Sequence, residues 1–158
     1  MLGLFKKEKE LLSPISGKAI DLKDVPDEVF AGKMAGDGIA IVPTGNVAVA
    51  PADGELTMLF GTKHAYGMTL SDGVEILVHI GIDTVVLKGE GFEALAKQGD
   101  RLKKGTPIIR FDTALIESKG YSLISPVLIT DPSAVKNFKA LTGMDTEAGV
   151  TPVITYSK

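Results

Sequence analysis

The two histidines of the chain, His64 and His79, are its side chains best suited to chemistry near neutral pH. His79 lies in the run Val74–Ile80, where every even-numbered residue is apolar and β-branched. This period of two predicts a strand that turns its even-numbered side chains toward the core. Glu75, Leu77 and His79 then lie on the opposite face, so the imidazole of His79 is predicted to point away from the main core.

His64 lies between the apolar run Glu55–Phe60 and the His79 strand. If Glu55–Phe60 and Val74–Ile80 are neighbouring antiparallel strands, both histidines can lie near one edge of the same sheet. The Thr62 hydroxyl could fix the tautomer of His64, and the backbone carbonyl near Gly81 could fix that of His79. Two imidazoles with orienting partners indicate nucleophilic chemistry more than packing.

Composition excludes several classes of function. The 158 residues predict one domain, and the absence of cysteine excludes disulfides, thiolate zinc sites and thiol catalysis. A net charge of −3 without a basic stripe argues against nucleic acid as a partner. No apolar run is long enough for a transmembrane segment, and the N-terminus lacks the pattern of a signal peptide. These features predict a cytoplasmic protein.

Residues 1–12 are predicted to form a flexible N-terminal arm, and residues 13–158 a single domain. Leu2, Leu4 and Phe5 precede lysines, a pattern that could give the arm weak contact with a membrane surface. A frayed tail is the alternative interpretation.

The rest of the chain consists of short β-prone segments separated by glycine and proline. This pattern predicts an all-β fold, an antiparallel β-sandwich or flattened barrel with one or two short helical turns. Besides the two runs above, β-prone segments are Lys18–Leu22, Val25–Phe30, Ile39–Val42, Val47–Ala50, Thr84–Lys88, Pro107–Phe111, Ser122–Ile124, Val127–Thr130 and Val153–Tyr156. Helices are predicted over Thr113–Lys119, before Gly120, and over Ser133–Leu141, after Asp131-Pro132.

Several long motifs together resemble a known family. The runs Thr62–Tyr66 and Gly73–Phe92 are similar to the glucose-type IIA component of the bacterial phosphoenolpyruvate-dependent sugar phosphotransferase system. The resemblance continues through Val25–Asn46, Ala50–Gly54 and Gly99–Gly105, and spans the chain from Ser13 to its end.

This resemblance implies an antiparallel β-sandwich that acts as a phosphotransferase component and phosphoryl carrier. In that family, a histidine phosphocarrier protein passes a phosphoryl group to one IIA histidine. The IIA protein then passes it to a cysteine of a IIB domain, which phosphorylates the sugar during uptake. By resemblance, His79 is the phosphorylated residue, His64 assists onward transfer, and Thr62 orients His64.

The resemblance also implies a partner-binding rim around His79. It assigns Asp27 and Asp83 to carboxylates that meet basic residues of the donor. It assigns apolar or rim positions to Val29, Phe30, Phe60 and Leu77, where Leu77 replaces an aromatic residue of other members. From the residues alone, the two aspartates could equally be turn residues and the two phenylalanines core residues.

The resemblance implies no required cofactor, although His64 and His79 could take zinc when a partner protein supplies further ligands. The sequence leaves three alternatives open. A zinc hydrolase would use His64, His79 and Asp83, and a biotinyl- or lipoyl-type carrier would present a modified lysine near Gly99–Gly105. A purely regulatory binding module would bind different target proteins in its free and phosphorylated forms.

Overall fold

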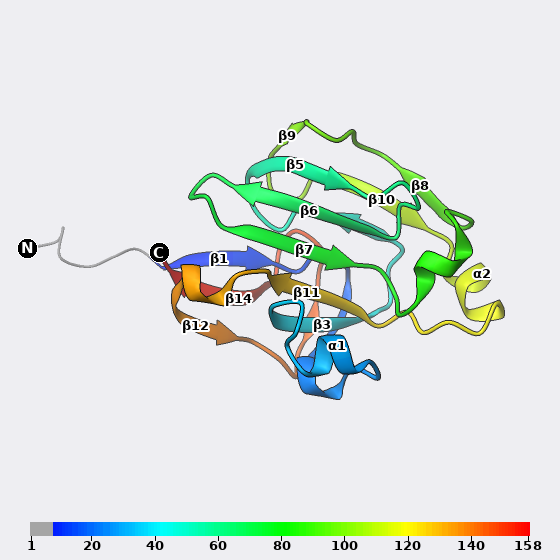
Figure 1. The fold of residues 1–158 in the computed structure, drawn as a ribbon, viewed down its shortest axis with the longest axis horizontal. Coiled ribbons are helices and arrows are strands. Elements are labelled where there is room, and N and C mark those ends of the chain that lie inside the picture. The colour runs from blue at the N-terminus through cyan, green and yellow to red at the C-terminus, as the bar shows by residue number, and fades with distance from the viewer. Residues whose placement is uncertain (1–7) are drawn as a thin grey trace, which may run out of the picture.

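An eight-stranded antiparallel sheet is the largest layer of the protein, whose computed structural model describes residues 8–158 (Figure 1). The strand order is β13-β2-β3-β11-β7-β6-β5-β9. In chain order, the strands are β2 (Gly17–Asp21), β3 (Asp37–Pro43), β5 (Gly54–Leu59), β6 (Ala65–Leu70), β7 (Glu75–His79), β9 (Arg101–Leu102), β11 (Ser125–Ile129) and β13 (Asp145–Thr146).

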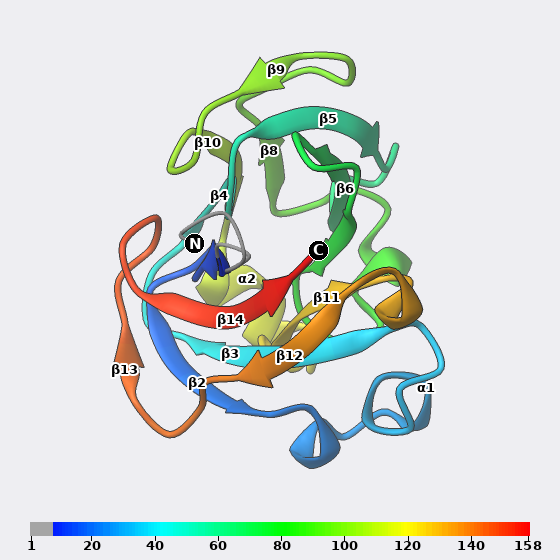
Figure 2. The same ribbon diagram turned by 90° about the vertical axis from the view of Figure 1, so that its left-hand side faces the viewer.

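Two smaller antiparallel sheets complete the β structure, and Figure 2 shows the large sheet curling around β14. One has the order β1 (Lys9–Leu12), β14 (Pro152–Ser157), β12 (Lys136–Ala140); the other is β4 (Val47–Val49), β10 (Pro107–Phe111), β8 (Phe92–Ala94). The helices are short: α1 (Glu28–Ala31), α2 (Thr113–Ser118) and the 3₁₀ turns η2 (Leu22–Asp24), η3 (Thr84–Leu87) and η4 (Pro132–Ala134). The predicted all-β antiparallel class is confirmed.

Both faces of the central strands are covered. On one face, Ile39, Val78 and Val127 belong to the main core, which β1, β10 and β14 also line. On the other face, Ala40 and Leu128 join a smaller cluster with Leu22, Val25, Phe30 and Ile82. Because side chains alternate along a strand, β3 and β11 supply both clusters. The second cluster lies on the face of β7 that bears His79.

The predicted alternation along β7 is confirmed. Val74, Ile76, Val78 and Ile80 are at most 2% exposed, whereas Glu75 is exposed. His79 is half-buried on the opposite face and ends the strand.

The predicted pairing of Glu55–Phe60 with Val74–Ile80 is wrong, because β6 lies between β5 and β7. The two histidines nevertheless come together through β6. Ala65 pairs with His79, and the Ile80 N–H donates to the His64 carbonyl at 2.7 Å. His64 therefore lies just before β6, beside the end of β7.

Four segments differ from the predicted secondary structure. Ser122–Ile124 is not a strand, because the chain there is irregular and β11 begins only at Ser125. Thr84–Lys88 is not a strand: η3 occupies it, with Asp83 and Lys88 in the left-handed region at φ 59° and 54°. Ser133–Leu141 is not a helix, because the helical turn that Asp131 caps ends at Ala134 and the chain then pairs as β12 with β14. Val25–Phe30 is not a strand, and its end forms part of α1.

The other predicted helix is confirmed as α2, with Gly120 at φ 88° just after its end. The predicted arm is too long at its C-terminal end, since Lys9–Leu12 forms β1 and buries Leu11 and Leu12. The predicted membrane contact of Leu2, Leu4 and Phe5 lies outside the described residues. Within residues 8–158, no helix is long and apolar enough to cross a membrane.

Candidate functional site

His79 is fixed at one ring nitrogen by the turn that follows β7. Its Nδ1 lies 2.7 Å from the Gly81 carbonyl oxygen. A carbonyl can only accept a hydrogen bond, so Nδ1 carries the proton and Nε2 keeps its lone pair. The imidazole is thus held in the tautomer whose Nε2 can act as a nucleophile.

The turn itself requires glycine at position 81. Gly81 has φ +76°, and a Cβ there would lie 2.6 Å from Thr84 Cγ2 and 2.7 Å from the Ser122 carbonyl oxygen. A side chain would therefore be strained by both the backbone angle and the contacts. The tight turn places the Gly81 carbonyl within reach of an imidazole only two residues earlier in the chain.

His64 is oriented by a hydroxyl instead of a carbonyl. Its Nδ1 lies 2.6 Å from Thr62 Oγ1, and the residue is 4% exposed. Burial, followed by repulsion from a charge on His79, lowers the pKa of His64 from 6.5 to about 4. His64 is therefore neutral near pH 7, so it can take part in hydrogen bonds but carries no positive charge.

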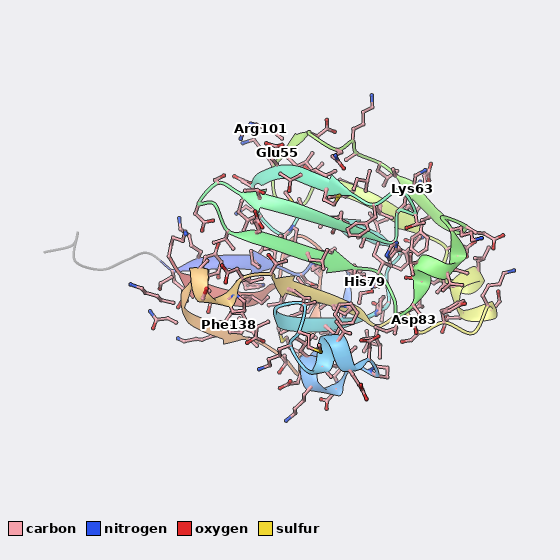
Figure 3. All side chains as sticks on the ribbon, viewed as in Figure 1. Glu55, Lys63, His79, Asp83, Arg101 and Phe138 are labelled. Atoms are coloured by element: carbon pink, nitrogen blue, oxygen red, sulfur yellow. The ribbon has the colours of Figure 1, made fainter. Side chains whose placement is uncertain are left out.

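Four aromatic rings form a continuous row through the site (Figure 3 labels His79). The His64 and His79 rings are 4.9 Å apart between centroids, with their planes at 79°. Phe30 contacts His79 at 5.0 Å and Phe60 contacts His64 at 5.4 Å. Phe30 is 8% exposed and acts as a buried wall, whereas Phe60 is 37% exposed and forms an open edge.

Opposing effects act on the protonation of His79. Burial lowers the pKa of this imidazole, while the hydrogen bond to Gly81 and the charges of Asp27 and Asp83 oppose that decrease. The net pKa is below 6.5. The nucleophilic neutral form therefore predominates at pH 7.

Asp27 has two roles. It caps the short helix α1, as expected of a turn residue, and its negative charge also raises the pKa of His79. Its carboxylate caps α1, accepting from the backbone N–H groups of Val29 at 2.9 Å and Phe30 at 3.4 Å. Val29, in the same helix, is 46% exposed. Asp83 is exposed and makes no side-chain cap to η3, and Figure 3 shows it close to His79.

Leu77 lies two residues before His79 on the same face of β7. It is half-buried and packs against the smaller cluster beneath α1. Leu77 thus supports the floor beside His79 while part of its side chain stays exposed.

Two exposed apolar residues of η3, Val85 and Val86, were not among the predicted site residues. They are 48% and 58% exposed and directly follow the Gly81 turn and Asp83. Their sequence, Thr-Val-Val-Leu, reads as a strand. In the structure, left-handed residues at Asp83 and Lys88 instead flank a 3₁₀ turn, which leaves both valines exposed.

Among residues 8–158, no group of three histidine, aspartate or glutamate side chains is gathered as metal ligands. The zinc-hydrolase alternative therefore lacks its third ligand, because Asp83 does not join the two histidines in such a group. What the site does present is a nucleophilic imidazole, a neutral second imidazole, exposed apolar side chains and carboxylates. This combination suits transfer of a phosphoryl group between proteins.

Comparisons with known proteins agree with this chemistry. Residues 9–135 match the family described as phosphoenolpyruvate-dependent sugar phosphotransferase system, EIIA 1. The PTS system glucose-specific EIIA component of Bacillus anthracis is 44% identical over 97% of this chain and 93% of that protein. The PTS system N-acetylglucosamine-specific EIICBA component of Klebsiella pneumoniae is 42% identical over 94% of this chain and 23% of that protein. The solved glucose permease IIA from Mycoplasma capricolum matches with a TM-score of 0.87 and 38% identity, covering 96% of this chain and 97% of that one.

Proposed function

Since this chain belongs to the EIIA 1 family of the phosphoenolpyruvate-dependent sugar phosphotransferase system, we propose that His79 is the residue that carries its phosphoryl group. Components of this family transfer phosphoryl groups by way of histidine. One observation carries the assignment to His79. Its Nδ1 is held by the Gly81 carbonyl at 2.7 Å, which leaves Nε2 as the free nucleophile.

In the accepting step, the lone pair of His79 Nε2 attacks the phosphorus of a phosphohistidine on the donor protein. A new P–N bond forms at Nε2 as the donor's P–N bond breaks, and the bonding pair returns to the donor's nitrogen. The proton stays on His79 Nδ1 throughout, donated in a hydrogen bond to the Gly81 carbonyl. In the onward step, a cysteine thiolate of the IIB domain attacks the phosphorus, an S–P bond forms and the Nε2–P bond breaks.

His64 assists by donating a hydrogen bond to the phosphoryl group. If the Thr62 hydroxyl donates to Nδ1, the proton of His64 is on Nε2 and can be offered to a phosphoryl oxygen. The ring contact of 4.9 Å places the two imidazoles side by side. Because burial keeps His64 neutral, Thr62 determines which nitrogen donates.

The face around His79 receives both partner proteins. The exposed side chains of Val29, Phe60, Val85 and Val86 offer apolar surface that a partner would cover. Asp27 and Asp83 add negative charge that steers a basic donor protein. The Klebsiella relative, named as an EIICBA component, supports a B unit as the acceptor. We place this relay in the cytoplasm.

Zinc fits this site only with help from a partner. The Nδ1 atoms of His64 and His79 are engaged by Thr62 and Gly81, which leaves the two Nε2 atoms as possible ligands. Two imidazoles do not complete the four ligands typical of a structural zinc site. A partner protein would have to supply the others, and carrier activity requires none of this.

Intact mass spectrometry tests the proposal. The chain is incubated with phosphoenolpyruvate, the general enzyme of the system and the histidine phosphocarrier protein. We expect one acid-labile, base-stable phosphoryl adduct on the wild-type chain and none on His79→Ala. His64→Gln, the matched substitution at the neighbouring imidazole, should still form the adduct. A folded His79→Ala chain that acquires the same adduct would contradict the assignment.

A further inference from the structure

Two fully buried hydroxyl groups hold the peptide unit that joins Ile80 to Gly81. Thr84 Oγ1 donates to the Ile80 carbonyl, and the Gly81 N–H donates to Ser125 Oγ at 3.1 Å. Thr84 and Ser125 are both 0% exposed. Both polar groups of this peptide are therefore satisfied by side chains from other elements, η3 on one side and β11 on the other.

The next peptide unit, which contains the Gly81 carbonyl, is tied to the same region. Its N–H belongs to Ile82 and donates to the Ser122 carbonyl at 3.0 Å. Ser125 Oγ in turn donates to the Leu123 carbonyl at 2.7 Å, so its own lone pair faces the Gly81 N–H. The turn after β7 is thus fastened to the segment that leads into β11.

Glycine makes this fastening necessary. Gly81 at φ +76° has no side chain that could restrict its backbone, and glycine readily adopts other angles. The direction of its carbonyl therefore depends on what holds the two flanking peptides. The hydroxyls of Thr84 and Ser125 are the side-chain groups that hold the first of them.

We propose that Thr84 and Ser125 are positioning residues for phosphoryl acceptance, because they fix the turn that aims the Gly81 carbonyl at His79 Nδ1. Without them, the carbonyl is free to swing away from the ring, and the imidazole can place its proton on Nε2, where it blocks attack. The choice of tautomer at a reactive histidine depends on the hydrogen bond at its other nitrogen. This inference rests on the proposed role of His79 as the nucleophile.

The substitutions Thr84→Val and Ser125→Ala remove each hydroxyl with little change in shape. Thr84→Ser is the rescue variant, because it keeps the hydroxyl and loses only a methyl group. Ser13→Ala is the matched control: Ser13 is also 0% exposed, and its Oγ lies 2.7 Å from the Ile15 carbonyl, between β1 and β2. All four chains are compared at equal folded concentration by circular dichroism.

The first readout is the ¹⁵N chemical shift of the two His79 ring nitrogens at pH 7.5. The wild-type chain should show Nδ1 protonated and Nε2 unprotonated. Thr84→Val and Ser125→Ala should show averaged shifts from a mixture of tautomers. Thr84→Ser and Ser13→Ala should match the wild type, even if Ser13→Ala unfolds at lower denaturant.

The second readout is the single-turnover rate of acceptance from the phosphorylated histidine carrier protein. We expect roughly tenfold slower acceptance in Thr84→Val and in Ser125→Ala, since small losses of alignment at a reacting group slow transfer steeply. The two substitutions are independent, so one well-folded variant is sufficient. Wild-type tautomer and rate in a folded variant would overturn the positioning role while leaving His79 as carrier. A wild-type chain that accepts no phosphoryl group would refute the carrier proposal instead, and the ¹⁵N shifts would still decide the positioning role.

Discussion

His64 and His79 are both held at Nδ1, but by groups of different chemistry. The Gly81 carbonyl can only accept, so it leaves His79 with an unprotonated Nε2. The Thr62 hydroxyl can donate, so it allows His64 to carry its proton on Nε2. In the proposed mechanism, the same ring therefore serves as nucleophile at one position and as hydrogen-bond donor at the other.

This division of roles makes a prediction for His64→Gln. The variant should accept the phosphoryl group from the donor, because Nε2 of His79 is unchanged. It should pass the group to a IIB domain roughly a hundredfold more slowly, the usual scale for a lost proton-bearing group at a transition state. The measurement is the decay of the adduct after mixing with IIB. Transfer at the wild-type rate would remove His64 from the mechanism.

Burial of His64 also predicts how stability depends on pH. The folded pKa is about 4 against 6.5 in the unfolded chain, so between these values the unfolded chain binds more protons. The contribution of this residue is complete above pH 6.5 and is lost as the pH falls toward 4. Urea titrations should show a smaller loss of stability over this range in His64→Gln than in the wild type. Equal losses in the two proteins would contradict the prediction.

At the scale of elements, the one-turn helix α1 combines structure with function. Asp27 accepts from two backbone N–H groups at its start, while the same charge opposes the burial effect on His79. The helix also supplies Phe30 as the wall behind His79 and leaves Val29 exposed beside it. The N-cap and the four helical residues thus bring a charge, a ring and an exposed apolar side chain to the surroundings of His79.

Two substitutions separate the cap from the charge. Asp27→Asn keeps a good N-cap, so the free energy of unfolding should change by only a few tenths of a kcal/mol, whereas Asp27→Ala should lose about 1 kcal/mol. Both should slow association with the basic donor protein, more strongly at low salt. Stopped-flow association rates at two ionic strengths provide the measurement. A normal association rate for Asp27→Asn would show that Asp27 serves α1 alone.

Elements whose faces alternate cleanly were predictable from the sequence, and those set by long-range pairing were not. In Val74–Ile80, four alternating β-branched residues predict which face of the strand is buried, and the observed strand β7 lies within this segment. Ser133–Leu141 begins with a good helix cap, yet pairing with β14 turns most of it into β12. Local propensity has no information about such a partner.

The site was also predictable only where local sequence patterns determine it. The closeness of the two histidines and their orienting partners followed from residue types and spacing. The intervening strand β6 did not, because Gly67 at its centre weakens the strand pattern. Thr84 and Ser125 gave no local signal, since their partners at Ile80 and Gly81 are reached only through the tertiary fold.

At the scale of the whole molecule, β1 and β14 join the two ends of the described chain. Lys9–Leu12 pairs with the last strand, and Leu11 is 0% exposed in the main core. β14 lies between β1 and β12 and contributes Val153, Ile154 and Tyr156 to the same core. The N-terminal strand is therefore part of the domain's stability and not an appendage to it.

Leu11→Ala should accordingly cost about 3 kcal/mol, the usual range for emptying a fully buried leucine site. Lys9→Ala in the same strand, where the side chain is exposed, should stay within about 0.5 kcal/mol of the wild type. Urea unfolding of the two variants provides the measurement. A near-neutral Leu11→Ala would mean that β1 pairs with β14 without supporting the core.

The pairing of β1 with β14 also fixes where a tether would leave the domain. In Figures 1 and 3, the beginning of β1 and the end of β14 lie at the left, while His79 and Asp83 lie right of centre. A linker at either end therefore leaves the His79 face uncovered. In a fusion of this unit to its acceptor, linker length would set the effective concentration at which donor and acceptor compete for that face. Because the first and last strands of the described chain pair away from His79, the same domain could work either as a separate chain or joined to its acceptor by a linker.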